Sequence, residues 1–181
     1  MTTWTIDHTH STAAFTVRHM MITTVRGSFS DIKGTITYDP ANPAAASVEA
    51  IIPAATVNTG VADRDNHLKS PDFFDAPNHP ELTFKSTSVQ STGENTAKII
   101  GDLTIHGLTH SVTLDAEFLG QNANPWTKAA TVGFTASTKI NREDWGLTWN
   151  QALEAGGWLV GKDINITLDV EAVQVAETAT A

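Results

Sequence analysis

The feature that most constrains this chain is the alternation of apolar and polar residues in three of its segments. A repeat of two residues indicates β-strands with one buried face and one face in water. Such strands must bring their apolar faces together, and a closed barrel does so without leaving an open edge. We therefore predict an all-β fold, an antiparallel eight-stranded barrel. The apolar series occupies even positions: Val112, Leu114, Ala116 and Phe118; Val132, Phe134, Ala136 and Ile140; and Ile164, Ile166, Leu168 and Val170.

Other segments supply further strands, turns and short helices. The spacing over Val61–Ser70 and a capped turn from Asn141 predict one or two short helices that close the barrel ends. Within Arg26–Asp39 the alternation changes phase, which a β-bulge explains, although a short piece leaving the sheet remains an alternative. The strand candidates are Thr3–Thr9, Ala14–Ile22, Arg26–Asp39, Ser47–Asn58, Glu81–Ser91, Ala97–His106, Ser111–Leu119, Ala129–Ile140 and Lys162–Val175.

Length and composition narrow the class of protein. The 181 residues fit a single domain, which we place at residues 4–176, with a frayed tail at 177–181. The net charge of -9 argues against nucleic acid as a partner, and no apolar run is long enough to insert in a membrane. The first residues lack the basic and apolar stretches of a signal peptide. We therefore expect a cytoplasmic protein, and a periplasmic or secreted one only if the chain is a processed form.

The sequence offers little for catalysis or metal binding. It contains no cysteine, no nucleophile-elbow pattern and no glycine-rich phosphate or dinucleotide motif. His8 and His10 share one strand face, but two imidazoles make only half of a tetrahedral site. His106 and His110 flank a predicted turn, where we expect them to be exposed. We assign no catalytic residue, no metal ligand and no cofactor.

The central question is whether the barrel is hollow. An eight-stranded barrel is either just filled by side chains or holds one small ligand. Small inward residues such as Ala50, Ala116 and Ala136 favour a cavity, but they also suit a packed, tapering barrel, so both interpretations stay open. If a pore exists, its predicted lining is Phe15, Val17, His19, Ile36, Ile52, Phe84, Leu103, Leu114, Phe134, Trp145 and Trp149.

Polar and aromatic clusters mark candidate barrel ends. The run from Asp63 to His67 either ties the helix to the rim or grips a polar head group, for which the candidates are Arg18, Arg64 and His67. The same run and His19 could instead supply acid–base groups to an enzyme that cyclises or dehydrates a lipophilic substrate. The pair Phe73-Phe74 could seal one end, as could four of the five tryptophans: Trp126, Trp145, Trp149 and Trp158.

The order of these motifs resembles the YceI-like family over nearly the whole chain. The matching segments are Trp4–Asp7, His10-Ser11, Phe15–His19, Val25–Phe29, Gly34–Ile36, Arg64–Ser70, Asp72–Asp75, His79-Pro80, Thr83-Phe84, Gly101–Gly107, Asn141–Gly146 and Leu159–Lys162. Trp145 stands where relatives often have Phe. The resemblance implies a lipocalin-like barrel with a long apolar pore and no catalytic residues.

The ligand that the resemblance implies is a polyisoprenoid or similar amphiphile, such as an isoprenoid quinone or a polyprenyl phosphate. Its tail would lie in the pore and its head near an opening. The implied function is binding, transport or storage of this lipophilic small molecule. A homodimer is compatible with the sequence but is not indicated by it.

Overall fold

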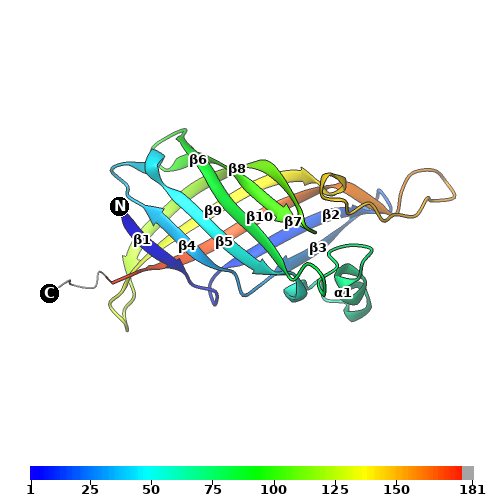
Figure 1. Ribbon diagram of the computed structural model, residues 1–181, viewed down its shortest axis with the longest axis horizontal. Coiled ribbons are helices and arrows are strands. Elements are labelled where there is room, and N and C mark those ends of the chain that lie inside the picture. The colour runs from blue at the N-terminus through cyan, green and yellow to red at the C-terminus, as the bar shows by residue number, and fades with distance from the viewer. Residues whose placement is uncertain (177–181) are drawn as a thin grey trace.

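The computed structural model describes residues 1–176, which form one ten-stranded antiparallel sheet curled into a barrel (Figure 1). The predicted tail at 177–181 lies outside the described residues. The N-terminus and the end of β10 lie toward one end of the long axis and helix α1 (Ala62–Lys69) toward the other. The strands are β1 (Thr2–Ile6), β2 (Thr12–His19), β3 (Thr23–Phe29), β4 (Lys33–Tyr38), β5 (Ser47–Pro53), β6 (Glu81–Ser91), β7 (Thr96–Ile105), β8 (Leu108–Ala123), β9 (Ala130–Asn141) and β10 (Val160–Gln174).

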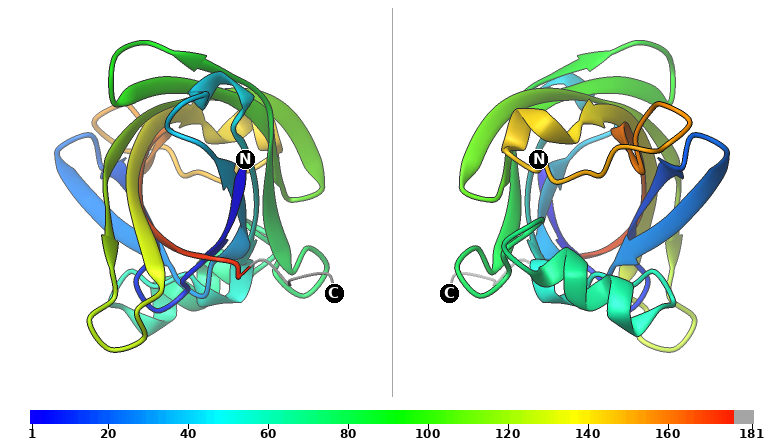
Figure 2. Two further views of the ribbon diagram at one scale, coloured as in Figure 1. Left: turned by 90° about the vertical axis from the view of Figure 1, so that its left-hand side faces the viewer. Right: turned by 90° about the vertical axis from the view of Figure 1, so that its right-hand side faces the viewer.

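Eight of these strands close the ring. Their order is β1-β4-β5-β6-β7-β8-β9-β10, and β10 pairs back onto β1 at Ala172–Gln174 (Figure 2). Strand β10 is long enough to pair also with β2, through Val160–Asp169. The β2–β3 hairpin therefore continues the wall where β1 ends. The predicted antiparallel eight-stranded barrel is confirmed.

The phase change within Arg26–Asp39 is a break between two strands. Of the two explanations, the piece that leaves the sheet is correct: the chain leaves after Phe29 and returns at Lys33 as β4, so Arg26–Asp39 is not one strand. Asp31 has a φ of 57°, a left-handed conformation that no regular strand contains. Ile32 is nonetheless buried in the core, so the break places an apolar side chain inside the barrel end.

One α-helix is present among residues 1–176, and it lies against the rim beside the ring of strands (Figure 2). The helix α1 carries Asp63 and Asp65 in its first turn and Lys69 in its last, which suits the helix dipole. Three short 3₁₀ turns accompany it: η1 (Pro43–Ala45), η2 (Ala54–Thr56) and η3 (Arg142–Trp145). As predicted, Asn141 caps the turn η3, accepting a hydrogen bond from Glu143 N at 3.0 Å. No helix in the described part of the chain is long and apolar enough to cross a membrane.

A two-residue hairpin joins β7 to β8 at the same end as α1. Ile105 pairs with Leu108, and the turn residues His106 and Gly107 both have positive φ, 53° and 75°. These angles match the twisted turn that suits a tight antiparallel hairpin. The turn brings His106 close to the loop that follows α1, where His79 lies.

Candidate functional site

The barrel interior contains two apolar pockets arranged in series. The larger has a cavity volume of about 220 Å³ and lies toward α1, and the smaller has about 120 Å³ and lies toward the β6–β7 turn. An apolar cavity of this kind stays dry and can accept an apolar guest. Both pockets are bounded by the same middle section of wall: Ile36, Val48, Phe84, Leu114, Leu168 and Val170. The two cavities are therefore neighbouring parts of one interior space, so the barrel is hollow.

Glycines in the wall help to keep the interior open. A Cβ atom added at Gly27 would overlap the ring of Phe15, which lies on the neighbouring strand. At Gly101 a Cβ atom would come within 2.5 Å of Cζ of Phe84. Each phenyl ring thus lies close against the wall in the space that a side chain would fill. These contacts limit how far both rings extend across the pore.

Most of the predicted pore residues border the cavities. Those that line the larger pocket are Phe15, Val17, Ile36, Ile52, Phe84, Leu103, Leu114 and Trp145, and Phe134 lines the smaller one. His19 and Trp149 lie outside both pockets. His19 ends β2, where it pairs with Thr23 and Val160. Trp149 packs outside the pore against His67 and Phe73, with ring centroids 4.6 and 5.5 Å away.

Apolar side chains from three separate segments cover the α1 end of the larger pocket. Leu68 comes from the helix, Phe73 and Phe74 from the loop after it, and Trp145 from η3. Trp145 is buried and donates from Nε1 to the backbone oxygen of Leu103 at 3.0 Å. The indole is therefore held in place while its ring faces the cavity.

The tryptophans do not form the single plug that their sequence clustering suggested. Trp126 is exposed in the β8–β9 turn, which lies at the end opposite α1, and Trp158 is half exposed. Only Trp145 among the four borders a cavity. The closeness of Trp126 and Trp145 in the sequence was misleading, because β9 lies between them and runs from one barrel end to the other.

An aromatic cluster lines the smaller pocket. Tyr38 contacts Phe118 and Phe134, with ring centroids 5.4 and 5.3 Å apart, and the two phenyl rings are 5.6 Å from each other. Burial raises the pKa of Tyr38, so its hydroxyl stays neutral. The aromatic side chains themselves therefore bring no charge to this pocket.

The larger pocket also contains one buried cation that sequence reasoning missed. Arg142 is 4% exposed and borders the apolar cavity. Its guanidinium donates to four backbone carbonyls, those of Gly161, Leu147, Trp149 and Val160. These bonds attach the segment after η3 and the start of β10 to the first residue of η3, directly after β9.

The electrostatic setting of Arg142 is unusual. Among residues 1–176, no carboxylate lies within ion-pair distance of it, and the neighbouring Glu143 is paired with Lys162 at 3.1 Å. Burial lowers the pKa of Arg142, partly countered by the charge of Glu143. The sequence did contain a sign that Arg142 faces inward: it is an even-numbered residue, and it continues the series of inward-facing even positions that ends with Ile140.

The predicted head-group residues lie outside both pockets. Arg18 is exposed. Arg64 donates to the hydroxyl and backbone oxygens of Thr59 at 2.7 and 2.9 Å. His67 is 2.8 Å from a carboxylate oxygen of Asp72. For Arg64 and His67 these contacts are those of the structural alternative, in which the helix is tied to the rim.

Comparison with known proteins agrees with this architecture. A family model described as "YceI-like domain" matches residues 4–172. The chain is 39% identical over 171 residues to UPF0312 protein SA2479 of Staphylococcus aureus (strain N315), covering 94% of this chain and 97% of that protein. The family match begins within β1 and ends within β10, so it includes every strand from β2 to β9 in full.

Two solved structures share the fold. BcnA of Burkholderia cenocepacia superposes with a TM-score of 0.80 at 22% identity, covering 92% of this chain and 98% of that one. A polyisoprenoid binding domain from Saccharophagus degradans superposes with a TM-score of 0.70 at 13% identity, covering 97% and 100%. From the family model and the staphylococcal relative together, we conclude that the chain belongs to the YceI-like family.

Proposed function

We propose that this protein binds and carries a lipophilic amphiphile, a polyisoprenoid in the first instance, in its pore without changing it chemically. The observation that carries this proposal is the hollow interior, which is lined almost entirely by apolar side chains. The similar fold of a domain described as polyisoprenoid binding supports the choice of ligand class.

The physical driving force is burial of the ligand's tail. Apolar surface removed from water contributes about 25 cal/mol per Å². A tail that buries roughly 400 Å² would thus gain about 10 kcal/mol before the costs of ordering are subtracted. The costs of association and ordering are of similar size, roughly 4–15 kcal/mol, so the affinity depends on how much more of the tail the pore buries.

Arg142 is a buried cation beside the apolar wall of the larger pocket. Of the five N–H donors of a guanidinium, four hydrogen bonds to backbone carbonyls leave one donor available. A buried cation without a carboxylate partner is stabilised by an anion. We propose that the ligand places a phosphate, carboxylate or similar oxygen group at Arg142 and its tail toward Phe84 and Phe134.

The two alternative functions have less support. A packed structural barrel would need a filled interior, whereas this barrel has two cavities. An enzyme would need ionisable groups at the substrate, but His19 and His67 lie outside the pockets, and the side chains of Asp63 and Asp65 belong to the helix on the rim. Binding is therefore the function that the site supports best.

Mass spectrometry of the protein purified from its own host tests the carrier function. We expect organic extraction to release a prenyl lipid in near-stoichiometric amount, and we expect the emptied protein to take up a geranylgeranyl compound in solution. Absence of any extracted lipid together with failure of uptake would contradict the proposal.

A matched pair of ligands tests the role of Arg142. Geranylgeranyl monophosphate and geranylgeraniol share one tail and differ in charge. We expect the phosphate to bind at least about tenfold more tightly, because one charge-assisted hydrogen bond is worth about 1.5 kcal/mol or more. Equal affinities, measured by calorimetry at fixed ionic strength, would mean that Arg142 is only structural.

A further inference from the structure

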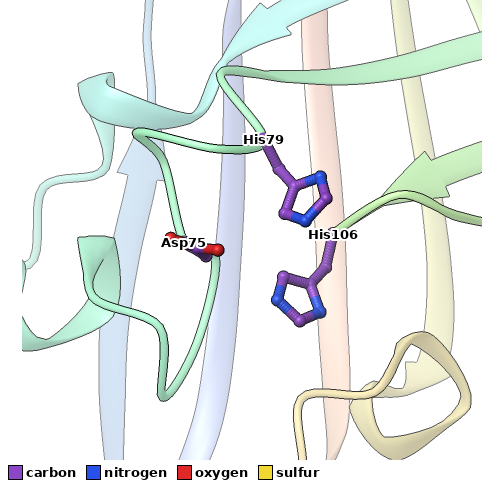
Figure 3. A group of neighbouring side chains, drawn as sticks. All are labelled: Asp75, His79 and His106. Atoms are coloured by element: carbon purple, nitrogen blue, oxygen red, sulfur yellow. The ribbon is translucent and has the colours of Figure 1, made fainter.

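We propose that Asp75, His79 and His106 form a binding site for a divalent transition-metal ion on the outside of the barrel (Figure 3). Each side chain offers one ligand atom, and these atoms all lie within 4.8 Å of one another. This site is separate from the pore and does not depend on the proposed lipid ligand. The sequence did not indicate it, because Asp75 and His106 are 31 positions apart in the printed numbering.

Two rigid local structures bring the three side chains together. Asp75 and His79 lie in the loop between α1 and β6, where the backbone oxygen of Asp75 accepts from Asn78 N at 3.0 Å and His79 N at 2.8 Å. His106 lies in the β7–β8 turn, and its ring centroid is 4.8 Å from that of His79. The ring of His79 also rests on Gly107, where an added Cβ would come within 2.9 Å of it.

The carboxylate of Asp75 is oriented for the role of a metal ligand. Asp75 is buried, and Nδ2 of Asn78 donates to its two carboxylate oxygens at 3.1 and 3.0 Å. Such outer hydrogen bonds fix a ligating carboxylate in metal sites. Asn78 is neutral, so the negative charge of Asp75 remains available to a cation.

The two histidines have no acidic partner in an ion pair. In the described part of the chain, the histidines that form ion pairs are His8, His10 and His67. His79 and His106 are half-buried, contrary to the exposure expected for His106, and solvent can reach a metal bound between them. Two imidazoles and one carboxylate are a donor set that Zn²⁺ and related ions prefer, with water completing the coordination.

The geometry requires only a small adjustment. With bonds of about 2.1 Å, tetrahedral Zn²⁺ holds its ligand atoms roughly 3.4 Å apart. The present separations are at most 4.8 Å, so side-chain rotations that shorten them by up to about 1.4 Å close the site. Backbone rearrangement is not needed, because both supporting turns are already formed.

A second cluster of similar composition supplies the control. Asp7, His10 and Glu171 also lie within 4.8 Å of one another. There, however, His10 is already paired with Asp7 at 2.9 Å and with Glu171 at 3.8 Å. The single imidazole of this cluster is thus already engaged by both carboxylates, whereas the proposed site has two imidazoles without an acidic partner in an ion pair.

Calorimetric titration of the chelator-treated full chain with Zn²⁺ tests the proposal, with Mg²⁺ as the hard-ion comparison. We expect one Zn²⁺ per chain, little Mg²⁺ binding, and a rise in the unfolding temperature with Zn²⁺. His106→Asn removes a ligand but keeps a residue that tolerates positive φ, and Asp75→Asn keeps the carboxamide contact with Asn78. Each variant, and His79→Gln, is expected to bind Zn²⁺ at least about tenfold more weakly.

The control variant is His10→Asn, which should bind Zn²⁺ as the unchanged protein does. Thermal unfolding without metal shows whether each variant is folded. The proposal is overturned if the unchanged protein fails to bind Zn²⁺, or if His10→Asn loses binding while His106→Asn and Asp75→Asn retain it. Equal binding by the protein and all three site variants would overturn it as well.

Discussion

At the scale of single residues, the turn after β1 shows how short polar contacts set charge states. Asp7 accepts from the backbone and hydroxyl of Thr9 at 2.8 and 2.6 Å and lies 2.9 Å from Nδ1 of His10. The hydrogen bonds from Thr9, then that of His10, lower the pKa of Asp7 to about 2. The hydrogen bond and charge of Asp7, with a smaller effect of Glu171, raise the pKa of His10.

The two shifts predict a pH window for this contribution to stability. The contribution of ionised Asp7 to the free energy of unfolding is fully present above its ordinary pKa of 3.8. It is lost as the pH falls through about 2. The contribution of protonated His10 is fully present below its ordinary pKa of 6.5. It is lost as the pH rises through the raised pKa of His10 in the folded protein. The contribution is therefore greatest between these two ordinary values.

Asp7→Asn should lower the free energy of unfolding by about 1 kcal/mol near pH 5, and by less near pH 2 and pH 9. Thermal unfolding of both proteins at the three pH values measures this difference. Asp115→Asn is the control, since its ion pair with Lys98 is exposed and should change little at any pH. A loss for Asp7→Asn that is the same at every pH would contradict the assignment.

At the scale of elements, close contact between neighbouring strands fixes one residue type. Gly34 in β4 faces Ala50 in β5, and a Cβ added to Gly34 would overlap the backbone oxygen of Glu49. A backbone atom in a paired strand cannot move aside as the end of a side chain can. The β4–β5 pair therefore requires glycine at this position.

We expect Gly34→Ala to destabilise the protein by about 3 kcal/mol, the cost of forcing extra volume into a packed place. Gly133→Ala in β9 is the matched control, because its added Cβ would meet only Leu119 Cβ at 3.7 Å, an ordinary contact. That change should be neutral or stabilising by about 0.5 kcal/mol. Urea unfolding compares the two, and equal effects would show that the contact at Gly34 is not limiting.

At the scale of the whole molecule, the hollow interior allows one substitution to weaken ligand binding without destabilising the fold. Ala50 borders the larger pocket, and its neighbour Ile51 faces outward with 42% of its surface exposed. A large side chain at position 50 would occupy the cavity that the ligand needs. The same side chain in a solid interior would cost about 1–3 kcal/mol.

Ala50→Phe is therefore expected to weaken binding of geranylgeranyl monophosphate at least about tenfold while leaving the unfolding temperature unchanged or higher. Ile51→Phe adds a ring to the outer face of the same strand and should leave binding unchanged. Calorimetry and thermal unfolding give both quantities. A marked drop in stability with normal binding for Ala50→Phe would indicate that the ligand lies elsewhere.

The sequence alone determined the strands, the short helix and the closed barrel. Alternation of side chains is a local property, so it identifies inward positions such as Leu114 and Phe134 without knowledge of their neighbours. The same alternation indicated that Arg142 faces inward. This was missed because the strand was predicted to end at Ile140. The break at Asp31 was left undecided, because a bulge and a loop change the phase in the same way.

The tertiary structure decided what comes together. The cavity depends on how Phe15 and Phe84 lie over glycines of neighbouring strands, and the sequence does not state which strands are neighbours. The path of the chain through the sheet also placed the β8–β9 turn, which contains Trp126, at the opposite end from η3, which contains Trp145, and it brought His106 to His79. Contacts between distant segments depend on the register and closure of the whole sheet, which no short stretch of residues contains.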